Sequence, residues 1–458
     1  MKKRVLFGTD GIRGVANRYP MTAEVCLSLG RATAHLINQN TLNKNNNHSR
    51  KSVVIGKDTR LSGYCFEQAI AAGICSMGVD VIFLGPMPTA AIASLTCTLK
   101  ASAGIMVSAS HNSFEDNGIK IFGSDGYKLP DAVELKLEQY TLSDELKSKL
   151  ADGAKIGKAK RLKNTIDLYE DSLTKHFSNE GDLKDLKIVM DCANGAAYKI
   201  APQLFSNLNA NVICIGNEPN GININDNCGA LFPLNMAKMV KEKKADFGVA
   251  FDGDADRAIF VDNEGELIDG DAIIALFSAR LKSLNSLRNN TVVTTVMSNL
   301  GLEKALAELG VALERAQVGD RYVSEQMREH HYNFGGEQSG HLIFADYSTT
   351  GDGILSAMFM AYLLKSEKKA LSEMKKIFIP SPQTLVNISV PKKMPLAELV
   401  KTTEAIKLVE KNLNGNGRVF VRYSGTENKA RILVEGPDKK TIDRHAKKIA
   451  NALLEEIA

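Results

Sequence analysis

The stretch FGVAFDGDADR at positions 247–257 joins a short apolar run to three carboxylates at every second position. The apolar run at 247–251 predicts a buried strand, and Asp252, Asp254 and Asp256 follow it. In extended backbone alternate side chains share a face, so these three carboxylates are expected to converge on one point. Converging carboxylates repel one another, and a divalent cation would relieve that repulsion. Ligands that are all oxygen favour Mg2+, Mn2+ or Ca2+ over zinc.

Two other interpretations of this stretch can be compared with its residues. An EF-hand loop beginning at Asp252 would need Gly at its sixth position and Glu at its twelfth. Those positions hold Arg257 and Asn263, which excludes an EF-hand. An exposed acidic turn capped by Arg257 is the remaining alternative, although surface turns with three spaced Asp seldom follow a buried strand.

Outward from this stretch, short apolar strands alternate with helical segments, which predicts α/β units. Most of the strands are apolar throughout and are expected to be buried and parallel. Expected strands are 53–56, 79–84, 104–107, 188–191, 212–215, 247–251, 291–295 and 418–421, and expected helices include 23–38 and 65–78. Segments 147–163 and 380–382 are expected to be linkers. The residues after 382 predict a small α+β domain with strands at 384–390 and 418–421 and helices at 396–412 and 439–456.

Length and composition exclude several classes of protein. At about 150 residues per domain, 458 residues suggest about three domains. A net charge of +4, no Trp and no apolar run near the length of a spanning helix argue against nucleic-acid and membrane partners. The first residues lack the apolar stretch of a secretory signal. Seven cysteines without C-x-x-C spacing disfavour disulfides and structural zinc, so we expect a cytoplasmic protein with reduced thiols.

A second motif, SASHN at 108–112, follows the expected strand 104–107. A hydroxyl at the carboxyl end of a buried strand lies where open α/β sheets bind ligands. Such a serine needs a base or prior modification to act as a nucleophile, and His111 and Lys120 are near enough in sequence to assist. A Ser/Asn-rich turn or a helix cap is the alternative.

Three further loops carry chemistry-bearing side chains. In GGEQSGH at 335–341, Glu337, Ser339 and His341 alternate and suit adjacent sugar hydroxyls, with a polar hairpin turn as the alternative. In RYSGTE at 422–427, with Arg431 beyond it, hydroxyls, backbone N–H groups and guanidinium forks suit a phosphate, with a salt-bridged turn as the alternative. The glycine-dense loop FGTDGIRG at 7–14 carries Arg13, which could pair a carboxylate or hold a phosphate.

These five motifs in this order resemble the α-D-phosphohexomutase superfamily over essentially the whole chain. The opening loop 7–14, the loop 336–341 and the segment VGDRYV at 318–323 are similar to its glucosamine branch. The resemblance implies three similar mixed α/β domains and a smaller C-terminal α+β domain around a central cleft. We place domain I at 1–160, domain II at 161–265, domain III at 266–379 and domain IV at 380–458.

The resemblance also implies roles for individual residues. Ser110 would be the phosphoserine, and Asp252, Asp254 and Asp256 would bind one Mg2+ together with it. The residues that would assist transfer are His111, Lys120 and Arg13. Substrate would contact Arg257 beside the metal loop, Glu337, Ser339 and His341 on the sugar loop, and Arg422, Ser424, Gly425, Thr426 and Arg431 on the phosphate loop. Ser113 stands where the family usually has Pro, which would loosen the loop but removes no catalytic group.

The implied reaction interconverts glucosamine 6-phosphate and glucosamine 1-phosphate. It would proceed through glucosamine 1,6-bisphosphate as intermediate or activator and would feed UDP-N-acetylglucosamine and cell-wall precursor synthesis. The protein would be an isomerase acting on a small sugar phosphate, as a monomer or homodimer. Alternatives are a phosphomannomutase/phosphoglucomutase of relaxed specificity, a metal-dependent phosphatase, and a non-catalytic sugar-phosphate or metal-binding regulator.

Overall fold

The computed structural model describes residues 4–8, 10–42, 51–423 and 428–457. The chain packs as two units. The first unit joins Met1–Val296 to Leu313–Lys376, and the second joins Met297–Ala312 to Ile377–Ala458. No helix among the described residues is long and apolar enough to cross a membrane.

The first sheet of the first unit is mixed. Within the described residues its strand order is β1 (Phe7–Gly8), β2 (Gly11–Val15), β6 (Asp116–Gly123), β5 (Ala103–Val107), β3 (Ser52–Lys57), β4 (Asp80–Pro86) and β7 (Ala159–Arg161). Strands β5, β3, β4 and β7 run parallel, whereas β6 is antiparallel to both β5 and β2. The carboxyl ends of β3 and β5 therefore meet at one edge of the sheet, which is where ligands bind in open α/β sheets.

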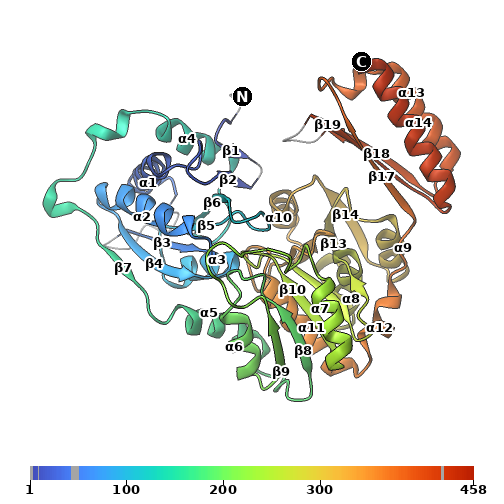
Figure 1. The fold of residues 1–458 in the computed structure, drawn as a ribbon, viewed down its shortest axis with the longest axis horizontal. Coiled ribbons are helices and arrows are strands. Elements are labelled where there is room, and N and C mark those ends of the chain that lie inside the picture. The colour runs from blue at the N-terminus through green and yellow to red at the C-terminus, as the bar shows by residue number, and fades with distance from the viewer. Residues whose placement is uncertain (1–3, 9, 43–50, 424–427, 458) are drawn as a thin grey trace. The chain divides into compact units, whose positions relative to one another are not determined.

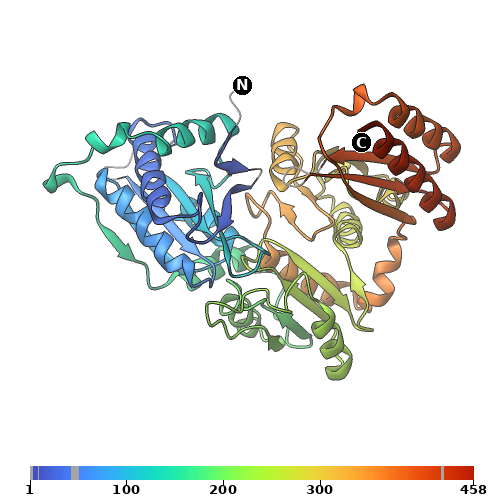
Figure 2. The ribbon, with the colours of Figure 1, turned by 45° about the horizontal axis from the view of Figure 1, so that its top comes forward.

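Helices cover both faces of this sheet. One apolar core joins it to α1 (Ala23–Asn38), α2 (Ser62–Ser76) and α4 (Asp131–Thr141), while α3 (Thr89–Thr98) contacts β3 and β5 outside that core. Helices α1 and α2 lie side by side in both views (Figure 1; Figure 2). Their close approach requires glycine, because a Cβ on Gly30 would lie 2.3 Å from the Ile70 carbonyl oxygen. Two 3-10 turns, η1 (Glu145–Ser148) and η2 (Gly153–Lys155), lead to β7.

The second sheet carries residues 252–257, which include the three aspartates and are called the metal loop below. Its order among the described residues is β12 (Leu267–Ile268), β11 (Ala258–Asp262), β10 (Phe247–Phe251), β8 (Lys187–Asp191) and β9 (Asn211–Ile215). Strands β10, β8 and β9 are parallel and β11 is antiparallel to β10. The accompanying helices are α5 (Thr165–Thr174), η3 (Lys175–Phe177), α6 (Ile200–Asn207) and α7 (Leu234–Lys243), of which α7 packs on β8 and β10.

The third sheet presents the expected sugar loop. Its order in the described part of the chain is β14 (Ala312–Ala316), β13 (Thr291–Thr295), β15 (Phe334–Gly336) and β16 (Leu342–Phe344). Its neighbours along the chain are α8 (Gly270–Ser283), η4 (Arg288–Asn290), α10 (Asp320–Glu329), α11 (Gly353–Glu367), α12 (Leu371–Met374) and η5 (Lys375–Ile377). Helix α11 is apolar on most sides and almost wholly buried, as expected of a helix inside a large unit.

The second unit is a small α+β structure. Its antiparallel sheet has the order β17 (Gln383–Ser389), β19 (Lys429–Glu435) and β18 (Arg418–Tyr423) among described residues. Its helices are η6 (Leu396–Glu398), α13 (Val400–Leu413) and α14 (Lys439–Ile457), and the last two lie side by side against the sheet (Figure 1). Helix α9 (Leu300–Glu308) also belongs to this unit, because Asn299 bonds Ser381 and the Leu300 N–H bonds Glu435.

The α/β class is confirmed, as are the expected strands and helices, with four corrections. The helix expected at 396–412 is a 3-10 turn, η6, followed by α13, which begins only at Val400. Strand 418–421 is antiparallel and half-buried rather than parallel and buried, because its sheet has one face toward its helices. The segment 147–163 is more than a linker, since β7 extends the first sheet beside β4. Strand β19 was not predicted from the sequence, because Lys and Arg at its start interrupt the apolar pattern of a strand. The four domain boundaries stay a prediction.

Candidate active site

The serine motif lies at the carboxyl end of β5. Every residue of β5 is buried, and the chain turns directly after it, with Ser110 in the left-handed region at φ 53°. Only a well-supported turn holds a non-glycine residue there. Ser108 Oγ supports this one by accepting from the Ser110 N–H at 2.9 Å and donating to Asp58 Oδ2 at 2.5 Å.

Two further side chains hold the carbonyls of this loop. Arg60, fully buried and paired with Asp58, donates to the carbonyl oxygens of Ser110 at 3.2 Å and Asn112 at 2.5 Å. Asn225 Nδ2 lies 2.9 Å from the same two oxygens. The loop is therefore clamped from both sides through its backbone, which leaves the Ser110 hydroxyl free to face the metal loop.

The three carboxylates do converge, but by a turn rather than by extended backbone. The Ala255 N–H donates to the Asp252 carbonyl at 3.0 Å, and Ala255 has φ 55°. One oxygen each of Asp252, Asp254 and Asp256 lie within 4.8 Å of one another, and all three side chains are buried. The extended geometry expected from the sequence is thus wrong, while the expected convergence is present. A Cβ at Gly253 would lie 2.5 Å from the Ser110 carbonyl oxygen, so the two loops meet only because this position is glycine.

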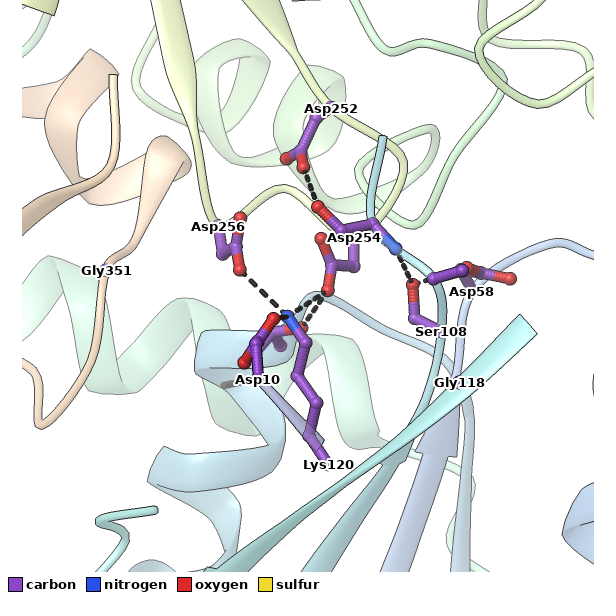
Figure 3. A network of polar contacts seen from close by, with 12 residues as sticks. Asp10, Asp58, Ser108, Gly118, Lys120, Asp252, Asp254, Asp256 and Gly351 are labelled. Carbon is purple, nitrogen blue, oxygen red and sulfur yellow. Dashed lines mark hydrogen bonds and ion pairs between the residues drawn. The ribbon is translucent and has the colours of Figure 1, made fainter. Parts of the chain in front are cut away.

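The serine hydroxyl and the lysine both reach this triad. Ser110 Oγ donates to Asp252 Oδ2 at 2.5 Å. Lys120 Nζ, from β6, lies 2.9 Å from Asp254 and 3.0 Å from Asp256. Figure 3 draws both contacts as dashed lines. Thr89, at the start of α3, anchors the metal loop further by donating its hydroxyl and N–H to the Asp254 carboxylate and carbonyl, at 2.6 and 2.9 Å.

The buried triad carries negative charge and carboxylate oxygens that a further cation could balance. Burial, followed by the charges of Asp256 and Asp254, raises the pKa of Asp252 to about 8. Asp254 Oδ1 and Asp256 Oδ1 are buried without a hydrogen-bond partner among the described residues. Buried carboxylate oxygens are normally paired or bound to metal. The residues present therefore fit a hard divalent cation, with oxygen ligands only.

His111 and Arg13 lie beside the serine loop. His111 Nδ1 is 3.3 Å from Ser110 Oγ, and burial, with the charges of Arg257 and Arg13, lowers the pKa of His111 to about 4. Arg13 donates to the Ala109 carbonyl at 3.3 Å and to Asp10 at 2.6 Å. Asp10 also lies 3.3 Å from Lys120. The first loop thus contributes a carboxylate as well as the expected arginine.

The expected sugar loop forms the hairpin between β15 and β16. The Glu337 N–H donates to the His341 carbonyl at 2.9 Å, and Ala258 N–H donates to the Gly340 carbonyl at 3.0 Å, which seats the loop beside the metal loop. His341 is buried, with Nδ1 3.7 Å from Asp256 and Nε2 3.4 Å from Asp320. Ser339 Oγ is buried without a hydrogen-bond partner in the described part of the chain. Arg257 Nε lies 3.8 Å from Asp256 Oδ1, and the charges of Asp256, Asp252 and Glu337 raise the pKa of Arg257 against the effect of burial.

The expected phosphate loop lies in the second unit. Arg422 on β18 and Arg431 on β19 are cross-strand partners. Burial and the charge of Arg431 lower the pKa of Arg422. Ser424, Gly425 and Thr426 lie outside the described residues.

Several residues of the site were not predicted from the sequence. Asp58 and Arg60 follow a strand that the sequence predicts, so charged residues at its carboxyl end were an available signal. Asp10 lies inside the opening loop 7–14. Thr89 and Asn225 carry no local signal, because their partners are far away along the chain.

Family models cover nearly the whole chain. The four models of phosphoglucomutase/phosphomannomutase match in chain order: alpha/beta/alpha domain I over 4–148, domain II over 167–265, domain III over 269–380 and the C-terminal domain over 385–452. The chain belongs to the phosphoglucomutase/phosphomannomutase family.

Within this family the chain is similar to phosphoglucosamine mutases. It is 52% identical to that of Anaeromyxobacter sp. (strain Fw109-5) over 454 residues, 98% of this chain and 95% of the relative. It is 51% identical to that of Myxococcus xanthus (strain DK1622), over 98% and 96% of the two chains.

Solved structures share the fold. A phosphoglucomutase/phosphomannomutase family protein from Burkholderia thailandensis has a TM-score of 0.77 at 21% identity, covering 98% of this chain and 96% of its own. N-acetylphosphoglucosamine mutase of Aspergillus fumigatus, solved with GlcNAc-6P and magnesium, has a TM-score of 0.67 at 17% identity, covering 100% and 96%.

Proposed function

We propose that this chain is a phosphoglucosamine mutase, an isomerase that interconverts glucosamine 6-phosphate and glucosamine 1-phosphate. The observation that carries the proposal is the 2.5 Å contact between Ser110 Oγ and Asp252 in a buried triad of carboxylates. This contact supports the proposal, because transfer through a phosphoserine requires a nucleophilic hydroxyl beside the groups that would bind the cation. Identity of about half the residues with phosphoglucosamine mutases over nearly full length supports the substrate.

The reaction consists of two phosphoryl transfers. In the first, the bond from phosphorus to Ser110 Oγ breaks and a bond from phosphorus to O1 of glucosamine 6-phosphate forms. O1 loses a proton and Ser110 Oγ gains one. In the second, Ser110 Oγ attacks the 6-phosphate of the resulting 1,6-bisphosphate and loses its proton. The bond from phosphorus to O6 breaks and O6 gains a proton, which leaves glucosamine 1-phosphate and the phosphoserine. The bisphosphate must turn over between the two steps, so the phosphate that does not react is held by a site separate from the triad.

His111 and Lys120 suit different tasks in these steps. The lowered pKa of His111, about 4, keeps the ring uncharged near neutral pH, and its Nδ1 is 3.3 Å from Ser110 Oγ. We assign His111 the transfer of the Ser110 proton. It would accept this proton when Ser110 Oγ attacks the bisphosphate and would return it when Ser110 Oγ leaves phosphorus. Lys120 keeps its charge, because Asp10, Asp254 and Asp256 raise its pKa well above the usual value against burial. It balances negative charge on the transferring group.

The remaining roles concern the cation, the serine loop, the sugar and the second phosphate. Asp252, Asp254 and Asp256 would hold Mg2+, which when bound neutralises charge on the phosphoryl oxygens. Arg13 steadies the serine loop through the Ala109 carbonyl. Arg257, Glu337, Ser339 and His341 would contact the sugar, and Arg422 and Arg431, with Ser424, Gly425 and Thr426, would hold its second phosphate.

Intact mass and turnover test the phosphoserine together. We expect purified protein to carry a fraction with about 80 Da of added mass, and Ser110→Ala to lose both that mass and mutase turnover. Ser113→Ala, on the exposed end of the same loop, is the matched control and keeps both. Ser110→Ala with full turnover would exclude the proposal.

Specificity is tested with the three sugar phosphates. We expect kcat/KM for glucosamine phosphates to exceed that for glucose and mannose phosphates. Preference for mannose 1-phosphate would instead assign a phosphomannomutase/phosphoglucomutase. Release of inorganic phosphate in step with substrate loss would assign a phosphatase.

A further inference from the structure

Lys128 lies between two carboxylates that come from distant parts of the chain. Its Nζ is 2.5 Å from Asp10 Oδ1 and also contacts Asp320 Oδ2. The side chain is 13% exposed, as is that of Asp320. Lys128 lies outside all five motifs of the family resemblance, and the roles assigned under the proposed function leave it without a task.

The backbone around Lys128 is fixed on both sides. Lys128 forms a bridge with Phe122 at the end of β6, and the Gly123 N–H donates to the Tyr127 carbonyl at 2.8 Å. Immediately after it, the Leu129 carbonyl accepts from Arg321, next to Asp320. The ammonium group is therefore presented from a held turn rather than from a free surface loop.

Asp10 connects Lys128 to the phosphoryl-transfer side of the site. Its other oxygen accepts from Arg13 at 2.6 Å and lies 3.3 Å from Lys120. Arg13 in turn bonds the Ala109 carbonyl, one residue before Ser110. The position of Asp10, seen beside Lys120 in Figure 3, thus affects both cations that face the serine loop.

Asp320 connects Lys128 to the sugar loop. Its Oδ2 lies 3.4 Å from His341 Nε2, and the neighbouring Gly319 N–H donates to Glu337 Oε1 at 3.2 Å. These contacts form a closed ring in which basic and acidic side chains alternate. In order, the ring contains Lys120, Asp256, His341, Asp320, Lys128 and Asp10.

The charge of Lys128 is needed by both neighbours. Burial would lower its pKa, yet the charges of Asp10 and Asp320 raise it. Removing one partner of a buried ion pair leaves an uncompensated charge, which costs far more than the pair contributed. Without the ammonium group, Asp320 would lose the positive charge that lowers its pKa most, and Asp10 would lose one of the three cations that lower its pKa.

We propose that Lys128 is a positioning residue that fixes the phosphoryl-transfer loops and the sugar loop relative to each other by holding Asp10 and Asp320. It acts through those two carboxylates and touches no reacting atom. The inference rests on the proposed function, because it concerns the alignment of the sugar with the phosphoserine. Misplacement by about 1 Å in such a site costs roughly a hundredfold in rate.

Steady-state kinetics on the full-length protein with Mg2+ and glucosamine 6-phosphate test this. We expect Lys128→Met to lower kcat by about 10- to 100-fold and to change KM less than about threefold. Lys128→Arg, which keeps the charge, recovers most of kcat. Lys155→Met, an exposed lysine on η2 with a side chain 78% exposed, is the matched control and behaves as the unaltered protein.

A double variant separates positioning from simple structural support. Lys128→Met with Asp320→Asn removes the carboxylate left uncompensated, so its kcat should exceed that of Lys128→Met by several-fold. Losses that merely add, or Lys128→Met with kcat within twofold of the unaltered protein, would overturn the inference. If Lys128→Met fails to fold, Asp320→Asn alone decides: several-fold lower kcat supports the inference and an unchanged kcat overturns it.

Kinetics of the unaltered protein with the different sugar phosphates distinguish a failure of the proposed function from a failure of the Lys128 inference. If the unaltered protein prefers mannose phosphates, the substrate assignment fails. The same variants then test Lys128 with the preferred sugar phosphate.

Discussion

The metal loop of the first unit and the β18–β19 pair of the second unit have opposite charge imbalances. The metal loop brings three buried carboxylates together, and repulsion with burial raises the pKa of Asp252 to about 8. The β18–β19 pair sets Arg422 opposite Arg431, and burial with that neighbouring charge lowers the pKa of Arg422. One region concentrates negative charge and the other concentrates positive charge.

Under the proposed function, the two regions would bind ligands of opposite sign, a divalent cation and a phosphate. In the metal loop the charge of Lys120 lowers the pKa of Asp256, whereas burial and the charges of Asp256 and Asp254 raise the pKa of Asp252. A bound cation would relieve the repulsion that remains there, and a bound phosphate would do the same for Arg422. The Ser110 loop, by contrast, is satisfied by neutral hydrogen bonds and by the Asp58–Arg60 pair. Unbalanced charge would therefore distinguish the groups proposed to bind ligands from the groups that hold the Ser110 loop in place.

Asp252→Asn should have the largest effect. It relieves repulsion in the metal-free protein, so the variant in EDTA should melt at or above the temperature of the unaltered protein. With Mg2+, activity should fall about 10³-fold, because charge stabilisation worth several kcal/mol is lost. Melting curves with and without Mg2+ measure this. Asp226→Asn, an exposed acid, is the control, and a Mg2+-induced stabilisation retained in Asp252→Asn would contradict the comparison.

Arg422→Met should act on binding rather than on chemistry. A charge-assisted hydrogen bond contributes about 1.5–3 kcal/mol, so KM for glucosamine 6-phosphate should rise about 10- to 100-fold with a smaller change in kcat. Protection against thermal unfolding by inorganic phosphate should weaken in parallel. Arg444→Met, exposed on α14, controls for loss of charge in the same unit. An unchanged KM would show that the Arg422–Arg431 pair does not bind the phosphate.

Thr89→Val should have a moderate effect, on metal affinity. The isosteric change removes the hydroxyl that donates to Asp254 at 2.6 Å, at a cost of about 1 kcal/mol. We expect Mg2+ to bind about fivefold more weakly in a melting-temperature titration. Thr96→Val removes a hydroxyl of the same helix that donates to the Ile92 carbonyl, and its Mg2+ titration should match the unaltered protein.

Asp352→Asn should change the free energy of unfolding in a pH-dependent way. Asp352 is a buried carboxylate outside the triad, so it shows the effect of burial without the repulsion between neighbouring carboxylates. Burial raises the pKa of Asp352 to about 6, although Leu355 N–H and Tyr169 hydroxyl bonds favour its charged form. Because the folded state holds this proton at a higher pH than the unfolded chain, stability falls as pH rises from about 4 to about 6. The variant lacks this fall, so its advantage in urea unfolding should grow by up to about 3 kcal/mol over that range.

Tyr169→Phe provides the opposite check on this carboxylate. It removes a donor to the charged form, so the fall in stability with rising pH should become steeper. An unchanged pH profile in both variants would show that Asp352 does not titrate in this range.

Sequence patterns predicted the parts of the fold that are apolar throughout. Strands β5 and β10 are buried at every position, so their length and character are plain in the sequence. Strand β7, with three exposed residues, and β19, with charges at its start, gave no such pattern. Their pairing depends on neighbours that arrive from other parts of the chain.

The same division holds for the site. Residues with a motif of their own, such as Ser110 and Asp254, were predicted from the sequence. Thr89 was not, because its partner Asp254 lies 165 positions away and a threonine near a helix start is commonly a capping residue. The small residues Gly253 and Ala255 allow the backbone to turn between the carboxylates, but the left-handed conformation of Ala255 was not predicted, because sequence rules expect glycine at such a position.

The membership of α9 in the second unit matters for exchanging modules between relatives. The C-terminal segment shares hydrogen bonds at Ser381 and Glu435 with the stretch around Asn299. A chimera that swaps only the tail would pair a foreign sheet with the resident helix and break both contacts. A functional graft would have to carry two pieces of chain, one of them taken from the middle of the preceding domain.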